Sequence, residues 1–156
     1  MAGYGRSPKK DPQRSEVYRW EDSFRHLFYA HGLRARQAHA LERQITEYYG
    51  IPRPRLRAAR WGKSGYTAAA YDTPTPLIVV NEDRAQFTGP LLAHELSHLV
   101  VPAYGHEEPD HGPLWLGVYL HVLDEWQILP ASMTVPSARQ AGLKFRDPAQ
   151  CGPKDL

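Results

Sequence analysis

The stretch Gly-Pro-Leu-Leu-Ala-His-Glu-Leu-Ser-His-Leu-Val-Val, residues 89–101, decides the fold. Its apolar residues recur at helical spacing, so it predicts a helix that begins around residue 89 and is broken by Pro102. Within this helix the sequence contains the motif HExxH. Histidines four positions apart lie one above the other on a helix face, so His94 and His98 can bind one zinc ion. Glu95 would then face a water on that ion, and the stretch predicts a metal-binding helix held against a core.

Two further helices are predicted before any strand. Apolar residues at helical spacing run over 17–28, and Asp11 and Pro12 before them suit the N-cap and first turn of a helix that ends near Gly32. The same spacing recurs over 35–49, where Gly and Pro residues then stop the pattern. The N-terminal part of the chain is therefore predicted to be helical.

Three short strands are predicted between these helices and the HExxH helix. They cover 55–61, 66–72 and 77–81, and turn-forming residues separate them. We expect the first two to pair as a hairpin. The third is apolar throughout 77–80, which is typical of a strand covered on both faces. The mixed composition of 66–71 favours a position near the edge of the sheet.

The chain after the HExxH helix predicts one strong element and two weak ones. A helix is expected over 113–126, followed by a weak helical stretch near 138–143 and a short strand at 143–145. The fold class is α+β, with a short mixed sheet. We expect one domain over 15–146, a disordered basic tail over 1–14 and a flexible C-terminal tail over 147–156.

Composition narrows the classes of protein to consider. With 156 residues the chain fits a single domain, and its 42% hydrophobic and 23% charged residues are ordinary for a globular protein. The single cysteine excludes an internal disulfide and a CxxC metal motif. No apolar run approaches the length of a membrane span or a signal core, so we expect a cytoplasmic protein without membrane contact.

A third metal ligand is expected downstream, because a catalytic zinc ion takes three protein ligands and keeps a fourth position open. In metzincin proteases and in YbeY-like endoribonucleases, a histidine follows ten positions after the first one. Tyr104 occupies that position here, which argues against both classes. Distance along the chain leaves eight candidates open: His106, Glu107, Glu108, Asp110, His111, His121, Asp124 and Glu125.

The HExxH motif at 94–98, followed by His-Gly-Pro-Leu-Trp at 111–115, resembles the SprT-like zinc metallopeptidases, which include the Spartan-type proteases. That family combines HExxH, a loop and an HGPxW element or similar. The chain also resembles small actinobacterial and actinophage proteins described as metallohydrolases. The resemblance implies a zincin-like domain in which Glu95 is the catalytic base and His111 is the third zinc ligand beside His94 and His98.

The position of His111 also suits a ligand for a reason independent of the family. It immediately precedes Gly112 and Pro113, which can start a helix, so a rigid element would place its side chain. Trp115, one turn further on, could form a wall of the site. We expect His106 to be solvated and His121 to pack in the core.

The expected function is a zinc-dependent hydrolase, most simply a metallopeptidase that acts on protein or peptide substrates. Glu95 would take a proton from the attacking water, and Tyr104 or Tyr119 could stabilise the oxyanion. An extended substrate could pair with the strand at 66–71. The alternatives are another zinc hydrolase, acting on phosphodiesters or small amides, and a non-catalytic zinc-containing interaction module.

A basic stretch raises the question of a nucleic-acid partner. Five positive residues fall within eleven positions that contain no acid: Arg53, Arg55, Arg57, Arg60 and Lys63. With Trp61 as a stacking surface, such a stretch could contact a nucleic-acid backbone weakly. A solvated strand face explains the same charges and is the reading we favour, because the net charge of the chain is only +2.

Overall fold

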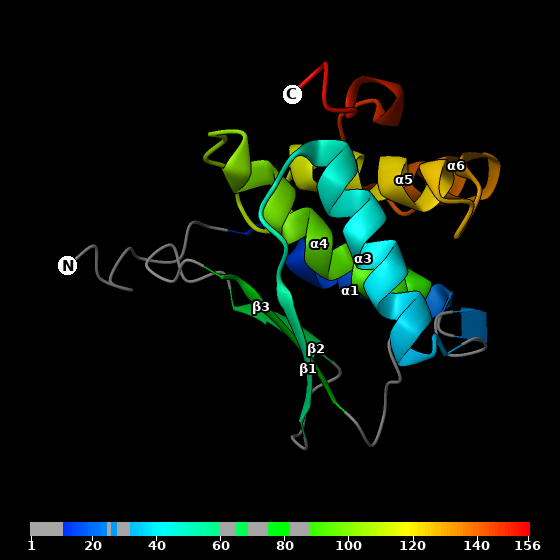
Figure 1. Ribbon diagram of the computed structural model, residues 1–156. Helices are drawn as coiled ribbons and strands as arrows, with labels where there is room; N and C mark the ends of the chain where they lie inside the picture. The colour runs from blue at the N-terminus through cyan, green and yellow to red at the C-terminus, as the bar shows by residue number, and fades with distance from the viewer. Residues whose placement is uncertain (1–10, 25, 28–31, 60–64, 69–74, 82–87) are drawn as a thin grey trace.

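The computed structural model describes residues 11–24, 26–27, 32–59, 65–68, 75–81 and 88–156 (Figure 1). Within this part the helices are packed together and the small sheet lies to one side of them (Figure 1). The fold class is α+β, as predicted. In chain order the elements are α1 (Arg14–Ser23), α3 (Ala35–Tyr49), β1 (Arg55–Ala59), β2 (Gly65–Ala68), β3 (Leu77–Asn81), α4 (Gly89–Ala103), α5 (Pro113–Glu125), α6 (Ala131–Gln140) and the 3₁₀ turn η1 (Pro148–Gln150).

The sheet has the strand order β1-β3-β2, with β3 parallel to β1 and antiparallel to β2. The predicted hairpin of the first two strands is therefore wrong. The apolar strand β3 takes the centre because Ile78 and Val79, which point to opposite faces, are both buried. Its predicted burial on both faces is confirmed. Among the described residues β2 pairs with β3 alone, so it lies at a sheet edge, as expected.

Helix α4 is the innermost element and packs against α5, α3 and β2. Most of its side chains are buried, which follows from a composition in which Glu95 is the one charged residue between positions 89 and 103. The Thr88 hydroxyl accepts a hydrogen bond from the Leu91 backbone N–H and caps the start of the helix. Pro102 lies inside the last turn, and the helix ends one residue later. The predicted helix is thus confirmed close to both ends.

The other two strongly periodic helices also match their predictions. Helix α3 ends at Tyr49, and Gly50 caps it with a φ of 64°, in the left-handed region that glycine adopts without strain. Helix α5 begins at Pro113, and the Glu108 carboxylate accepts a hydrogen bond from the Leu114 backbone N–H at 3.0 Å. This cap fixes the start of α5 directly after His111, so the loop that carries this histidine is tied to a rigid element.

The first helix differs from its prediction at both ends. Helix α1 spans Arg14–Ser23, with Gln13 as its N-cap residue, so Asp11 is not the cap and no helix runs continuously to Gly32. Residues 11–14 are packed rather than part of a disordered tail. The Gln13 side chain donates hydrogen bonds to the carbonyls of His111 and Lys144, at 2.7 and 3.0 Å. This side chain attaches the start of α1 to two distant loops.

The last part of the chain is also more ordered than predicted. Helix α6 begins at Ala131 rather than near 138, and the described 143–145 segment forms no strand. The first turns of α6 were not predicted because β-branched residues and Pro136 weaken the helical pattern of this segment. Residues 147–156 are not a flexible tail: Cys151 is buried, and its carbonyl accepts a hydrogen bond from the Tyr49 hydroxyl at 2.9 Å.

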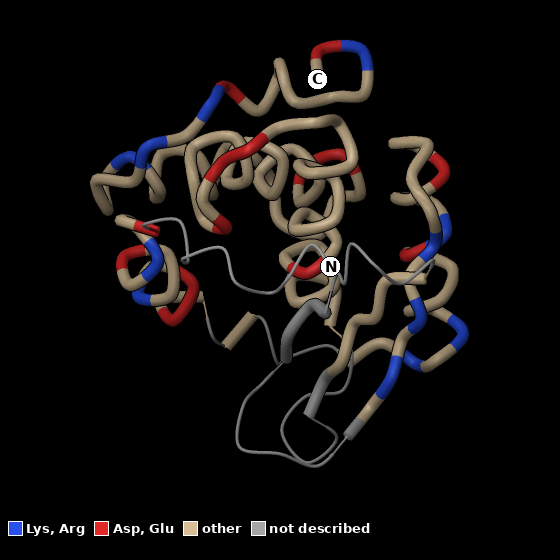
Figure 2. The backbone as a smooth tube through the Cα atoms, turned by 90° about the vertical axis from the view of Figure 1, so that its left-hand side faces the viewer, with Lys and Arg blue, Asp and Glu red and all other residues tan. Residues whose placement is uncertain are grey.

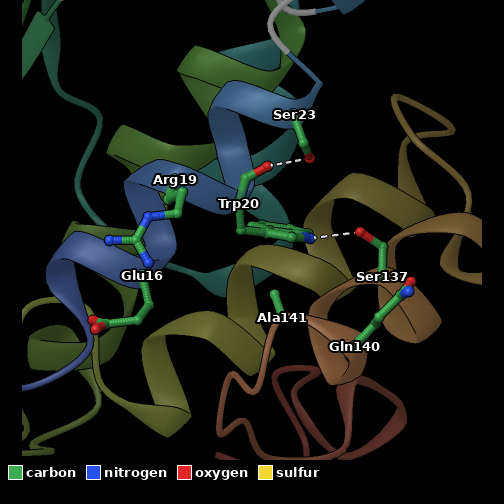
Figure 3. Close-up of a pocket in the computed structure, with 7 residues that line it drawn as sticks. All are labelled: Glu16, Arg19, Trp20, Ser23, Ser137, Gln140 and Ala141. Atoms are coloured by element: carbon green, nitrogen blue, oxygen red, sulfur yellow. Dashed lines mark hydrogen bonds between the residues drawn. The ribbon is translucent and has the colours of Figure 1, made fainter.

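A hollow separates α1 from α6 (Figure 3). The Trp20 ring crosses from α1, and its indole N–H donates to the Ser137 hydroxyl at 2.8 Å. Val17 on the same helix is also fully buried. Burial of an indole and an isopropyl group contributes a few kcal/mol, on the order of 2 for each, so α1 is anchored to the helical core.

Candidate metal centre

Three histidines that are far apart in the sequence meet at the junction of α4 and α5. His94 and His98 lie one turn apart on α4, and His111 lies just before α5. One ligand atom from each of them lies within 4.8 Å of the others. His94 and His111 are buried, and His98 is partly buried. The structure thus brings together the three predicted ligands in a cluster that could bind a metal ion.

Two of the nitrogen atoms have the separation expected of ligands on one tetrahedral metal ion. The Nε2 atoms of His94 and His98 are 3.2 Å apart. Two imidazole nitrogens bound to one zinc ion at about 2.0–2.1 Å would be separated by about 3.3 Å, so little movement is needed. The Nε2 atom of His111 is buried without a hydrogen-bond partner. Because buried polar atoms nearly always have a partner, this orphaned nitrogen suits a metal ligand.

The opposite ring nitrogens of two of these histidines face carboxylates. Nδ1 of His94 is 2.6 Å from Oε1 of Glu21, and Nδ1 of His111 is 2.7 Å from Oδ2 of Asp11. Metal-binding histidines commonly donate their second ring N–H to a carboxylate, which fixes the ring and its tautomer. Both hydrogen bonds leave Nε2 free to face the cluster, so the arrangement is oriented for metal binding.

Neither carboxylate can be recognised as a partner of the histidines from its position in the sequence. Asp11 was assigned to a helix N-cap, and Glu21 was one acid among several on an amphipathic helix. Only the docking of α1 on α4 brings Glu21 to His94. Their positions in or near the first predicted helix do not distinguish these two acids from Glu16 or Asp22.

Burial favours the neutral form of two of the three histidines. Burial lowers the pKa of His98 well below its usual value, and the neighbouring His94 and His111 lower it further. Burial lowers the pKa of His111 as well, despite the opposing hydrogen bond from Asp11. For His94, burial acts in the same direction, but the Glu21 carboxylate outweighs it and the net pKa is raised. His98 and His111 are therefore neutral at neutral pH, the form that binds a metal.

Trp115 forms the wall expected of it. Its ring stacks on His98 at a centroid distance of 5.0 Å and meets His94 and His111 edge-on at 4.8 and 4.7 Å. The side chain is only 1% exposed. The three imidazoles thus share one aromatic floor, which restricts their rotation and excludes water from that side.

Glu95 lies on α4 beside the first histidine and is 5% exposed. Its charge acts on His94, raising the pKa of that imidazole after the larger effects of burial and Glu21. It also contributes to the raised pKa of the Tyr18 hydroxyl, for which burial is the largest cause. The predicted base is therefore near one candidate ligand and near a tyrosine that no motif of the sequence distinguishes.

The two tyrosines that were considered as oxyanion donors are differently placed. The Tyr104 hydroxyl donates to the Tyr49 carbonyl at 2.6 Å, so it is committed to a contact with α3. The Tyr119 ring lies 5.5 Å from His94, but the residue is fully buried. Tyr104 thus already donates its hydroxyl proton, and Tyr119 is not exposed to solvent.

Several other candidate ligands have structural roles. His121 packs as expected, with Nδ1 2.8 Å from the Pro148 carbonyl. Asp124 caps α6 by accepting the Ala131 N–H, and Glu108 caps α5. His106 lies 3.2 Å from the Leu156 oxygen. None of these side chains belongs to the histidine cluster.

The basic stretch is only partly available for a nucleic-acid partner. Arg53 forms an ion pair with the buried Glu42 at 2.6 Å, so its charge is neutralised. Arg55 and Arg57 are exposed on β1, and residues 60 and 63 lie outside the described part of the chain. Figure 2 shows Lys and Arg mixed with acidic residues around the periphery of the molecule. Weak nucleic-acid contact stays a prediction.

The hollow between α1 and α6 is separate from the metal centre. It is lined by Glu16, Arg19, Trp20, Ser23, Ser137, Gln140 and Ala141 (Figure 3). None of these residues is a candidate ligand. The α1 residues that line the hollow at positions 16, 19 and 23 lie on the opposite face of the helix from Glu21, which contacts His94. The hollow and the histidine cluster are therefore on different sides of α1.

Comparisons with protein-family models, curated proteins and solved structures found no match to the chain. Within the described residues, no helix combines the length and the apolar character that crossing a membrane requires. What the histidine cluster can do is therefore inferred from its own geometry and from the motifs that form it.

Proposed function

We propose that this chain is a zinc metallopeptidase with a zincin-like domain, and that His94, His98 and His111 bind the metal. The observation that carries the proposal is the convergence of the HExxH pair with a third histidine whose buried Nε2 has no partner. The resemblance to the SprT-like family supports it, because the HGPxW element supplies this histidine and its wall, Trp115. The carboxylates on two of the ligands add to the fit.

Glu95 is proposed as the general base. Bound Zn²⁺ would supply Lewis-acid chemistry, lowering the pKa of a water toward about 7 and polarising the substrate carbonyl. Glu95 accepts one proton from the attacking water as the new C–O bond forms and the carbonyl π electrons move to oxygen. The C–N bond then breaks, its electron pair goes to nitrogen, and nitrogen takes the proton from Glu95. The products are a carboxylic acid and an amine.

Two features favour an enzyme over a structural metal site. A structural zinc site usually has four protein ligands, whereas the described cluster has three and includes an adjacent carboxylic acid that such a site does not need. The edge position of β2, which packs beside α4, also suits a peptide substrate. An extended peptide can add to such an edge through its backbone hydrogen bonds.

The test is cleavage of fluorescein-labelled casein, an unfolded protein, by the zinc-loaded chain. Glu95→Gln should keep its zinc and lose at least about 1000-fold in rate, because it cannot accept the proton. Glu125→Gln, an exposed acid on α5, is the matched control and should retain the wild-type rate. Full activity in the zinc-bound Glu95→Gln protein, or no cleavage by the zinc-bound wild type, would contradict the proposal.

A further inference from the structure

One face of α1 covers the histidine cluster. Arg14, Tyr18 and Glu21 fall at i, i+4 and i+7 of this helix and so share a face. Glu21 reaches His94 directly. The Tyr18 ring meets His111 edge-on at a centroid distance of 5.1 Å and lies parallel to His94 at 6.3 Å. Helix α1 therefore contributes side chains to the metal centre itself.

Tyr18 combines contact with the cluster and exposure to solvent. Its side chain touches two candidate ligands, yet the residue is 41% exposed. Trp115, which touches the same histidines, is buried. The two rings thus differ in exposure: Trp115 is buried, and Tyr18 is a contacting ring that a substrate arriving from solvent can meet.

We propose that the Tyr18 hydroxyl donates a hydrogen bond to the substrate oxygen that becomes negative when water adds to the carbonyl. This inference rests on the proposed peptidase function and assigns the oxyanion-stabilising group to α1. A donor placed beforehand at such an oxygen lowers the barrier because its charge is complementary to the transition state. Tyr18 would be a catalytic residue, since its hydroxyl contacts the reacting atoms.

The surroundings of Tyr18 favour this role over simple packing. The Arg14 guanidinium carbon lies 5.7 Å from the centre of the Tyr18 ring, so a positive charge stands next to this tyrosine. The tyrosine hydroxyl has an O–H that can donate a hydrogen bond to such an oxygen.

Tyr104 and Tyr119 do not meet these conditions. Tyr104 donates its proton to the Tyr49 carbonyl, and Tyr119 is fully buried on α5. Among the described tyrosines that contact the histidine cluster, Tyr18 is the one that also faces solvent. Exposure, contact with the ligands and a neighbouring cation thus coincide at one residue.

The variant Tyr18→Phe removes the hydroxyl and keeps the ring against His94 and His111. We expect kcat on labelled casein to fall by about 10- to 1000-fold with little change in KM, as for the loss of one oxyanion donor. The zinc content should stay at the wild-type level. Tyr48→Phe is the matched control, because Tyr48 is similarly exposed at 37% and lies on α3 beside His121.

A second measurement does not depend on turnover. The Co²⁺-substituted protein is titrated with acetohydroxamate, a small anion that places oxygen atoms on the metal, and binding is followed by visible absorption. Tyr18→Phe should weaken the affinity about tenfold, the value of one hydrogen bond to a charged group, and Tyr48→Phe should not change it. Equal affinity of the Tyr18→Phe and wild-type proteins, including no measurable affinity in either, overturns the proposal.

The two proposals fail in different ways. If the zinc-bound Glu95→Gln protein is fully active, the peptidase mechanism is wrong. If Glu95→Gln is inactive while Tyr18→Phe retains both the wild-type kcat and the wild-type acetohydroxamate affinity, the peptidase mechanism stands and only the role of Tyr18 is wrong.

Discussion

Nδ1 of His94 lies 2.6 Å from Oε1 of Glu21, although 73 positions of the chain separate these residues. An equivalent contact of 2.7 Å joins His111 to Asp11 across 100 positions. The candidate ligands belong to α4 and to the start of α5, whereas both carboxylates come from the first described residues. The orientation of the metal centre therefore depends on how α1 docks on the helical core.

The first prediction concerns these two carboxylates. Glu21→Gln and Asp11→Asn should each weaken zinc binding by about 10- to 100-fold, because the ligand rings lose a charged acceptor that fixes their tautomer and orientation. The dissociation constant is measured by competition with a chromophoric chelator. Asp22→Asn, an exposed acid on the same helix, serves as the control. Wild-type zinc affinity in both carboxylate variants would show that the contacts do not support the metal.

The second prediction concerns the aromatic wall. Trp115→Ala should lower the free energy of unfolding by about 3–5 kcal/mol, since it leaves a cavity where a fully buried indole packed on three imidazoles. Urea denaturation of the metal-free protein measures this loss without the contribution of zinc. Trp126→Ala removes a partly exposed indole and should cost clearly less. Equal losses in the two variants would contradict the role assigned to Trp115.

The third prediction tests the packing of the C-terminal segment. Burial raises the pKa of the Cys151 thiol from 9.0 to about 11. At about pH 8 only about 0.1% of it is thiolate, so the native protein should react very slowly with a thiol reagent such as Ellman's reagent, and quickly in concentrated urea. A flexible tail would give rapid reaction in both conditions.

The same pKa shift has a defined effect on stability. The folded protein favours the neutral thiol, so its contribution to stability is fully present below the unfolded pKa of 9.0 and is lost as pH rises through about 11. Cys151→Ser lacks this group and should show a smaller loss of stability over that window. Parallel urea titrations of the two proteins measure the difference.

The sequence was sufficient for elements whose own residues determine them. The long apolar periodicity of α3, α4 and α5, with Gly50 and Pro113 at their ends, predicted these helices closely. The HExxH spacing likewise placed His94 and His98 on one face of a helix. Such features depend on contacts within a few residues, and a local pattern contains that information.

Features that depend on distant contacts were missed. Strand β3 lies between β1 and β2 because this position buries both of its faces. The patterns of β1 and β2 predict two strands but do not encode which strand lies between them. The packing of residues 147–156 depends on Gly117, where a Cβ atom would lie 2.8 Å from the Cys151 sulfur. The contacts of Tyr18 and Glu21 with the histidines depend on the docking of α1. In each case the decisive neighbour is far away in the sequence.

The most direct test of the metal centre is the zinc content of the purified chain by elemental mass spectrometry, with His111→Ala and His39→Ala in parallel. His39 is an exposed histidine on α3 and controls for adventitious binding. About one zinc ion per chain is expected in the wild type and in His39→Ala, with loss or marked weakening in His111→Ala, because two histidines alone hold zinc poorly. A wild-type protein without zinc after reconstitution, or a His111→Ala protein with undiminished zinc affinity, would contradict the three-histidine site.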